Sequence, residues 1–160
     1  MKRLYFIFLF FVFCSLSAQN TLSSREWQED LRYLQKTVNK NGEGIEVLDI
    51  QNKITVFDYD QTVISYKRLR NESSNPKGAV EITYKFHLEH IEKVEVKAYQ
   101  LEGVEEKLWQ VVLLTKDKHK LVLLNGYLNV SLVPFTVDNE AAALSIQQAF
   151  EEVLTMVHAL

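Results

Sequence analysis

Apolar and polar side chains alternate without interruption from Val80 to Leu88, in the segment VEITYKFHL. Successive side chains of a β-strand point to opposite faces, so this period of two predicts a strand with one dry and one wet face. The dry face must be covered by a second layer of structure. We therefore expect the middle of the chain to form a sheet that packs against an apolar surface.

Comparable runs fill the chain from Gly44 to about Phe135 and are expected to be strands. They occupy residues 45–50, 53–59, 62–66, 91–98, 108–115, 119–124 and 127–133. Turn-forming pairs separate them at Gln51/Asn52, Asp60/Gln61, Asp117/Lys118 and Asn125/Gly126. Asn125 and Gly126 tolerate the positive φ of a type I′ hairpin turn. Consecutive hairpins predict a mostly antiparallel meander of about seven strands.

An amphipathic helix is expected before the sheet region. Ser23 and Glu26 have the spacing of a capping box. Apolar residues then recur every three or four positions, at Trp27, Leu31, Leu34 and Val38. Asn39, Asn41 and Gly42 are residue types that can close the last turn.

A second helix is expected after the sheet region, with Asp138 as its N-cap and Glu140 in its first turn. Its apolar stripe consists of Leu144, Ile146, Phe150, Val153, Leu154 and Val157. Ala142 and Ala149 allow this helix to approach the sheet closely. A helix, a series of strands and a final helix is the order of an α+β domain, since a parallel sheet needs alternating strands and helices.

A cleaved signal peptide is expected at residues 1–18. Lys2 and Arg3 precede an apolar run at residues 4–14, and small residues lead up to Ala18, where a signal peptidase would cut. The apolar run is shorter than the ~20 residues that cross a membrane. We therefore predict export, either to the periplasm or to the outside of the cell.

Retention of this segment as a membrane anchor, or lipidation at Cys14, is the alternative. Cleavage leaves residues 19–160, a length typical of a single domain, and removes the only cysteine of the chain. We expect no transmembrane span in this mature chain. The whole chain has a net charge of −3, and the loss of Lys2 and Arg3 makes it more acidic. A general binder of nucleic acid or of anionic membranes is therefore not expected.

The strand LEHIEKVEVKAY and the closing helix NEAAALSIQQAFEEVLTMV, after several short strands, resemble the pleckstrin-homology-like (PH/GRAM-like) superfold over residues 45–158. The resemblance implies about seven antiparallel strands that curl into two orthogonal sheets or a barrel, with the C-terminal helix capping one open end. The helix at residues 24–40 is an addition to that plan. The first hairpin, DIQNK, has only Lys53 where phosphoinositide-binding members carry a basic cluster, so the resemblance implies a binding scaffold without lipid specificity.

The segment FDYDQTV at residues 57–63 resembles the signature of haloacid-dehalogenase phosphatases, an apolar strand followed by Asp, any residue, Asp, any residue and Thr. The resemblance implies a Mg²⁺-dependent enzyme in which Asp58 attacks phosphorus and Asp60 acts as acid and base. Gln61 replaces the usual glycine, and a strand and a basic loop follow where the family has a helix. The alternative interpretation is a hairpin with Asp60 and Gln61 at its tip.

Two histidines flank a carboxylate in the segment FHLEHIE, and these residue types can bind zinc. In a strand, His87 and Glu89 share one face, whereas His90 lies on the other face or past the strand end. We therefore expect two exposed histidines and no metal site.

The main basic cluster of this acidic chain is expected in a loop at residues 66–78. This loop is longer than the ~4–6 residues of a typical connection. Its cations, Lys67, Arg68, Arg70 and Lys77, form a candidate site for a carboxylate, a phosphate or an acidic partner. A solvated loop without a ligand is the alternative.

The sequence contains no constellation of nucleophile, histidine and acid, no glycine-rich phosphate loop and no nucleic-acid-binding signature. We therefore predict a non-catalytic exported binding or accessory domain without a cofactor, whose partner is a protein or a small ligand. The competing hypothesis is the phosphatase that uses Asp58 and Asp60.

Overall fold

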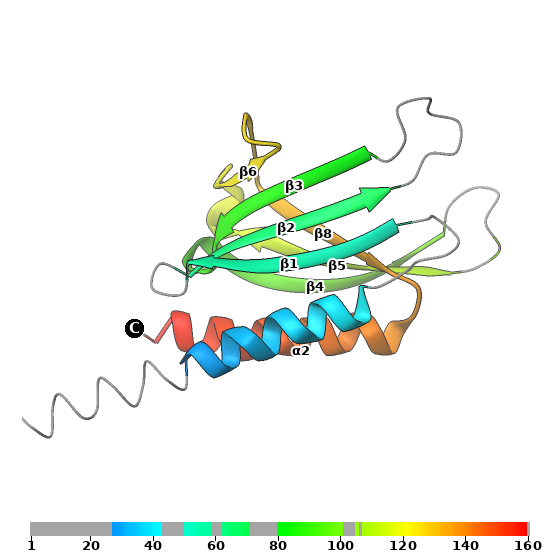
Figure 1. Ribbon diagram of the computed structural model, residues 1–160, viewed down its shortest axis with the longest axis horizontal. Coiled ribbons are helices and arrows are strands. Elements are labelled where there is room, and N and C mark those ends of the chain that lie inside the picture. The colour runs from blue at the N-terminus through cyan, green and yellow to red at the C-terminus, as the bar shows by residue number, and fades with distance from the viewer. Residues whose placement is uncertain are drawn as a thin grey trace, which may run out of the picture.

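The computed structural model describes residues 27–42, 50–58, 62–70, 80–100, 105 and 107–159. In these residues, strands occupy one side of the molecule and helices lie along the other (Figure 1). The fold class is α+β, as the order of elements predicts.

The strands form two separate sheets. The five-stranded sheet has the order β1-β2-β3-β6-β7, with bounds Ile50–Asp58, Val63–Arg70, Val80–His87, Val122–Leu124 and Leu128–Val130. The three-stranded sheet has the order β4-β5-β8, with bounds Ile91–Tyr99, Leu108–Thr115 and Leu132–Val137. Every neighbouring pair is antiparallel, which confirms the predicted strand orientation. No ladder joins the two sheets among the described strands, so they do not close into a barrel.

The predicted meander order is wrong, because β6 lies beside β3 and β8 lies beside β5. Two short 3-10 turns, η2 (Leu88–His90) and η3 (Lys116–Lys118), carry the chain from one sheet to the other instead of closing hairpins. Ser131, a single residue between β7 and β8, marks a third change of sheet, because β7 belongs to the five-stranded sheet and β8 to the three-stranded sheet. The run predicted as one strand at residues 127–133 is therefore two strands in different sheets.

Individual strands follow the prediction where the apolar period is strongest. β5 has the predicted bounds, and β3 stops at His87. By contrast, the turn predicted at Gln51/Asn52 is wrong. β1 runs through both residues, which pair with Leu69 and Arg68 of β2 as ordinary members of the ladder.

The hairpin predicted at Asn125/Gly126 is confirmed. Both residues have positive φ, at 51° and 79°, and the Tyr127 amide donates a hydrogen bond to the Leu124 carbonyl at 3.2 Å. Positive φ at both central residues is the mark of a type I′ turn. β6 and β7 pair on either side of it.

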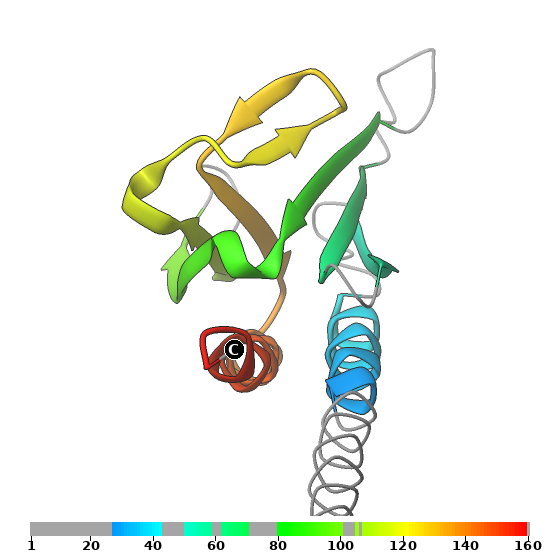
Figure 2. The same ribbon diagram turned by 90° about the vertical axis from the view of Figure 1, so that its left-hand side faces the viewer.

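Aromatic rings connect the layers of the core. Tyr66 of β2 and Phe135 of β8 are both fully buried, and their ring centroids are 4.1 Å apart. Phe135 also contacts Phe150, with ring centroids at 5.5 Å. These rings link the two sheets to the C-terminal helix α2 (Glu140–Val157), which Figure 2 shows end-on beneath the strands.

Helix α2 has the predicted place and two features that differ from the prediction. Its N-cap is Asn139 and not Asp138, because the Asn139 side chain accepts a hydrogen bond from the Ala142 amide at 2.8 Å. Leu144 is half exposed and lies outside the apolar stripe. The buried face consists of Ala142, Ala143, Ile146, Ala149, Phe150, Val153 and Leu154.

Residues 27–41 are helical, and three of their apolar side chains belong to the same core. Leu31, Leu34 and Val38 are fully buried, and Trp27 packs against the core from a partly exposed position.

The signal peptide predicted at residues 1–18, including Cys14, lies outside the described residues. The capping box of Ser23 and Glu26 lies outside them as well. Among the helices that the structure describes, none is long and apolar enough to cross a membrane.

Candidate functional site

The predicted basic loop is strand over its first residues. β2 contains Lys67, Arg68 and Arg70, and Lys77 lies outside the described residues. Because side chains alternate along a strand, Lys67 lies on the outer face, whereas Arg68 shares the face of the buried Tyr66. Lys67 and Arg68 therefore lie on opposite faces of β2, and the side chains of Arg70 and Lys77 lie outside the described part of the chain.

Lys67 is engaged within the sheet. Its Nζ lies 3.0 Å from Glu81 Oε1 on β3. The hydrogen bond and the positive charge of Lys67 lower the pKa of the Glu81 carboxyl. Both side chains are about half exposed, at 52% and 48%, so the pair is a weak surface ion pair. Its charge is already matched, which makes Lys67 a poor anchor for an anionic ligand.

Asp58 is the last residue of β1 and is paired with Val63 of β2. Asp60 and Gln61 lie outside the described residues. β2 follows after a short connection and runs antiparallel to β1. Haloacid-dehalogenase phosphatases have a helix and further parallel strands after the corresponding aspartate, so this pairing favours the hairpin interpretation.

His87 and His90 lie side by side, and His90 lies past the end of β3, which is one of the two positions that the sequence allowed for it. β3 ends at His87, and the next three residues form the 3-10 turn η2. Residues three apart eclipse one another in a 3-10 turn, and this turn brings His90 back beside His87. The two ring centroids are 5.1 Å apart, with 50° between the ring planes. In the described parts of the chain, no group of three or more His, Cys, Asp or Glu side chains is arranged to hold a metal ion.

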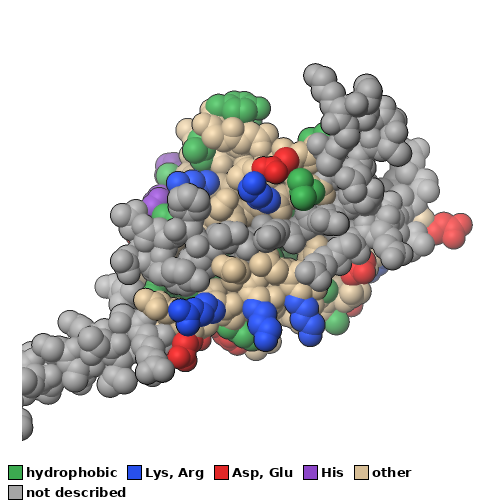
Figure 3. Space-filling view, viewed as in Figure 1, with side chains coloured by type: hydrophobic (Ala, Val, Ile, Leu, Met, Phe, Trp, Pro, Cys, Tyr) green, Lys and Arg blue, Asp and Glu red, His purple; other side chains and the backbone are tan. Residues whose placement is uncertain are grey.

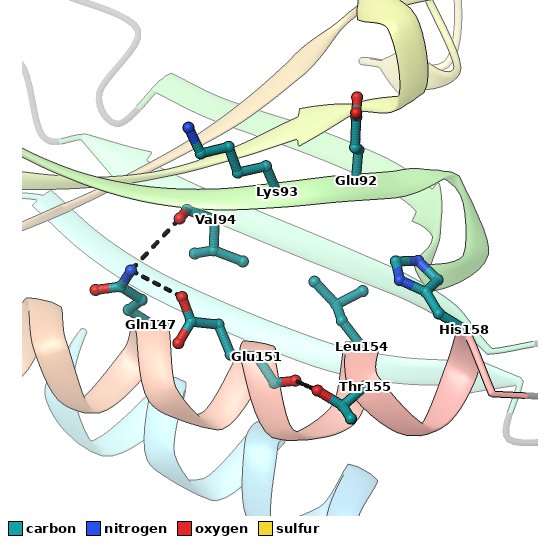
Figure 4. A pocket seen from close by; sticks show the side chains of 8 residues that line it. All are labelled: Glu92, Lys93, Val94, Gln147, Glu151, Leu154, Thr155 and His158. Carbon is teal, nitrogen blue, oxygen red and sulfur yellow. Dashed lines mark hydrogen bonds between the residues drawn. The ribbon is translucent and has the colours of Figure 1, made fainter.

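A shallow groove of about 540 Å³ lies between β4 and α2 (Figure 4). It is lined by Glu92, Lys93, Val94, Gln147, Glu151, Leu154, Thr155 and His158. Gln147 Nε2 donates hydrogen bonds to the Val94 carbonyl at 3.4 Å and to Glu151 Oε1 at 2.9 Å. The amide that spans the groove therefore holds α2 to the edge of the sheet, and the groove is a seam between these two elements.

The free edge of β4 is protected by charge. Glu95 lies 2.9 Å from Lys93 Nζ and 2.6 Å from Lys97 Nζ. Hydrogen bonds from Lys97 and then from Lys93 lower the pKa of Glu95 to about 2. Charged side chains on an edge strand, lysine above all, discourage pairing with another chain.

β7, a short edge strand of the five-stranded sheet, has the sequence LNV and carries no charge. Tyr127, in the adjoining turn, is 79% exposed, and Leu128 is 50% exposed. Leu121 and Leu132, at the base of the hairpin, are also exposed. We call these four residues the hairpin surface. Figure 3 shows hydrophobic side chains at the top of the molecule, where Figure 1 places this hairpin.

Sequence reasoning located this hairpin but not its exposed surface. The signal was present, since Tyr127 and Leu128 directly follow the Asn-Gly turn, where polar residues are usual. The groove residues gave no comparable signal, because Val94 and Gln147 are 53 positions apart.

The chain was compared with models of protein families, with curated proteins and with solved structures, and none of them matches it.

Proposed function

We propose that this chain is a non-catalytic exported binding or accessory domain whose hairpin surface binds a protein partner. The observation that carries the proposal is the concentration of exposed apolar side chains on one hairpin. Seven large apolar side chains are exposed in the described residues, and four of them lie within residues 121–132, in this hairpin or directly beside it. A group of exposed apolar side chains on a folded domain often marks an interaction site, whereas single exposed apolar residues are common and need no explanation.

The charge distribution over the sheet edges supports the same surface. β4 is an edge strand with a ladder of charged side chains, whereas the edge strands β7 and β8 carry none, and β8 is mostly buried. β7 has only three residues, so it offers a partner few backbone hydrogen bonds. Most of the contact must come from side chains, and a rigid aromatic group such as Tyr127 is the type that dominates protein interfaces. The partner should present an apolar pocket or groove.

Export and the scaffold type are parts of the same proposal. Export is supported by the succession of basic, apolar and small residues at positions 1–18. A PH-like scaffold is supported by two antiparallel sheets with a C-terminal helix packed on β4 and β5. The strand order, with β6 beside β3, departs from a simple meander.

The test uses photo-crosslinking in cells of the organism that makes the protein. A photoreactive amino acid replaces Leu128 in one variant and Leu144 in the other. These two leucines form a matched pair, since they are 50% and 49% exposed on different elements. A discrete adduct is expected from position 128 only.

The captured protein is then purified and its binding is measured. It should bind the wild type and Leu144→Ser, and it should not bind the double variant Tyr127→Ser/Leu128→Ser. Equal adducts from both positions, or undiminished binding by the double variant, would reject the hairpin surface.

The non-catalytic part of the proposal has its own test. Wild type and Asp58→Asn are assayed for Mg²⁺-dependent hydrolysis of p-nitrophenyl phosphate. No hydrolysis above the uncatalysed rate is expected from either protein. Hydrolysis by the wild type that disappears in Asp58→Asn would replace this proposal by the phosphatase hypothesis.

A further inference from the structure

The turn after β3 holds two imidazole rings in contact at the protein surface. Leu88, the first residue of η2, is fully buried, and its amide donates to the Thr62 carbonyl at 3.1 Å. The Ile91 amide closes the turn on the Leu88 carbonyl. His87 and His90 flank this anchored segment, with ring centroids 5.1 Å apart.

The environment of His90 favours one tautomer. Glu89 Oε1 lies 3.6 Å from His90 Nε2, so the carboxylate attracts the ring proton to Nε2. His90 Nδ1 then carries a lone pair. Among the described residues, it is a buried side-chain nitrogen without a hydrogen-bond partner. A buried polar atom that lacks a partner is unfavourable, so a ligand that binds this lone pair would relieve that cost.

We propose that His87 and His90 bind a divalent transition-metal ion of the nitrogen-preferring type, such as Zn²⁺. In metal sites, a ligating histidine usually donates its other ring N–H to a carboxylate, and Glu89 Oε1, which lies 3.6 Å from His90 Nε2, would take that part when the ion binds. The ring spacing also fits. An ion about 2.0–2.1 Å from one nitrogen of each ring, at a near-tetrahedral angle, places the ring centres about 5 Å apart.

Two histidines supply half of a tetrahedral set, so water or a side chain of a bound partner completes it. Such a site is weaker than a closed structural zinc site, and its ion exchanges with solvent. Protons compete with the metal for the imidazole nitrogens, so the affinity falls as the pH is lowered. This site is independent of the hairpin surface and of the proposed function.

The test is isothermal titration of the protein with Zn²⁺, with Mg²⁺ as the oxygen-preferring control ion. We expect one Zn²⁺ site and no Mg²⁺ binding. His87→Ala and His90→Ala should each lower the Zn²⁺ affinity at least tenfold, and Glu89→Gln should lower it by about tenfold. His119→Ala and His158→Ala are the matched controls, since both side chains are exposed elsewhere, and they should bind as the wild type does.

A second measurement keeps the proposal testable if a variant fails to fold. Zn²⁺ is added to the wild type, and the ring nitrogens of the four histidines are followed by NMR. The resonances of His87 and His90 should shift together, with the metal on Nδ1 of His90. The proposal is overturned if His119 or His158 shifts equally, or if the double variant His87→Ala/His90→Ala keeps the wild-type affinity.

Discussion

Thr83 and Asn125 exchange two hydrogen bonds between β3 and the turn that follows β6. The Asn125 amide donates to the Thr83 carbonyl at 2.7 Å, and the Thr83 amide donates to Asn125 Oδ1 at 2.8 Å. The ladder between β3 and β6 itself has only two residue pairs, Tyr84 with Leu124 and Lys85 with Leu123. Asn125 thus extends a very short ladder by one step, with its side chain as the acceptor.

Replacement of Asn125 by alanine should destabilise the fold by about 1–2 kcal/mol. The side-chain hydrogen bond is lost, and alanine tolerates the φ of 51° less well than asparagine does. Urea unfolding measures the change. Asn125→Gly separates the two effects, since glycine accepts positive φ and loses only the hydrogen bond, and it should lose less than Asn125→Ala. Equal losses in the two variants would mean that the positive φ contributes nothing.

Phe135→Ala should be among the most destabilising single substitutions in the chain. The ring is fully buried, contacts Tyr66 of one sheet at 4.1 Å and contacts Phe150 of α2 at 5.5 Å. Its removal leaves a cavity where three layers meet, and we expect a loss of about 3–5 kcal/mol in the free energy of unfolding. Phe135→Leu, which refills most of the volume, should lose clearly less. A loss below about 1 kcal/mol in Phe135→Ala would show that the three layers are not joined by this ring.

The parts of the fold that depend on neighbours in sequence could be predicted. The alternation in β3, the apolar run of β5 and the Asn125/Gly126 turn are local patterns, and each appears where the sequence placed it. The order of the strands within the two sheets could not be predicted in this way. It depends on which distant strand β6 pairs with, and the two pairs between β3 and β6 leave no mark in either segment.

The contact between His87 and His90 could not be predicted from a local pattern either. His87 and His90 meet because the strand gives way to one 3-10 turn, which changes the side-chain period within three residues. Nothing in FHLEHIE distinguishes that turn from a continued strand. The exposed surface at Tyr127 and Leu128 was visible in the sequence, but its exposure follows from the position of β7 at a sheet edge.

Two adjacent residues, Asp138 and Asn139, are candidates for the N-cap of α2, and their substitutions can be told apart by stability measurements. Asn139 accepts from the Ala142 amide at 2.8 Å, while its own amide group donates to Asp138 Oδ1 at 2.6 Å. Asp138 therefore supports the cap without forming it. Asn139→Ala should lower the stability by about 1 kcal/mol, and Asp138→Ala should lower it by less. Thermal unfolding followed by circular dichroism measures both. A larger loss in Asp138→Ala would reverse the assignment.

Tyr66 should remain protonated well above the usual tyrosine range. Its side chain is fully buried, and burial raises the pKa of the phenol because the charged form loses its hydration. The unfolded chain releases this proton near pH 10, so the contribution of Tyr66 to stability is complete below that pH and is lost as the pH rises above it. Absorbance at 295 nm should show one tyrosine fewer titrating than in the unfolded protein. Tyr66→Phe removes the difference, and a wild type whose tyrosines all titrate near pH 10 without unfolding would contradict the burial.

Glu95, on the edge strand β4, has a lowered pKa that can be tested at low pH, as the raised pKa of Tyr66 can be tested at high pH. Its pKa is lowered from 4.5 to about 2 by hydrogen bonds from Lys97 and, second, from Lys93. A lowered pKa stabilises the fold at pH values above about 4.5, and this contribution is lost as the pH falls from there toward about 2. The two lysines are 59% and 64% exposed, so the stability effect is small and the carboxyl titration is the better measurement.

NMR of the side-chain carboxyl carbons should give a midpoint of about 2 for Glu95 in the wild type. Lys97→Met should raise this midpoint more than Lys93→Met does, because Lys97 makes the larger contribution. A wild-type midpoint near 4.5 would mean that neither ion pair persists in solution, and the edge of β4 would then lack the protection that distinguishes it from β7.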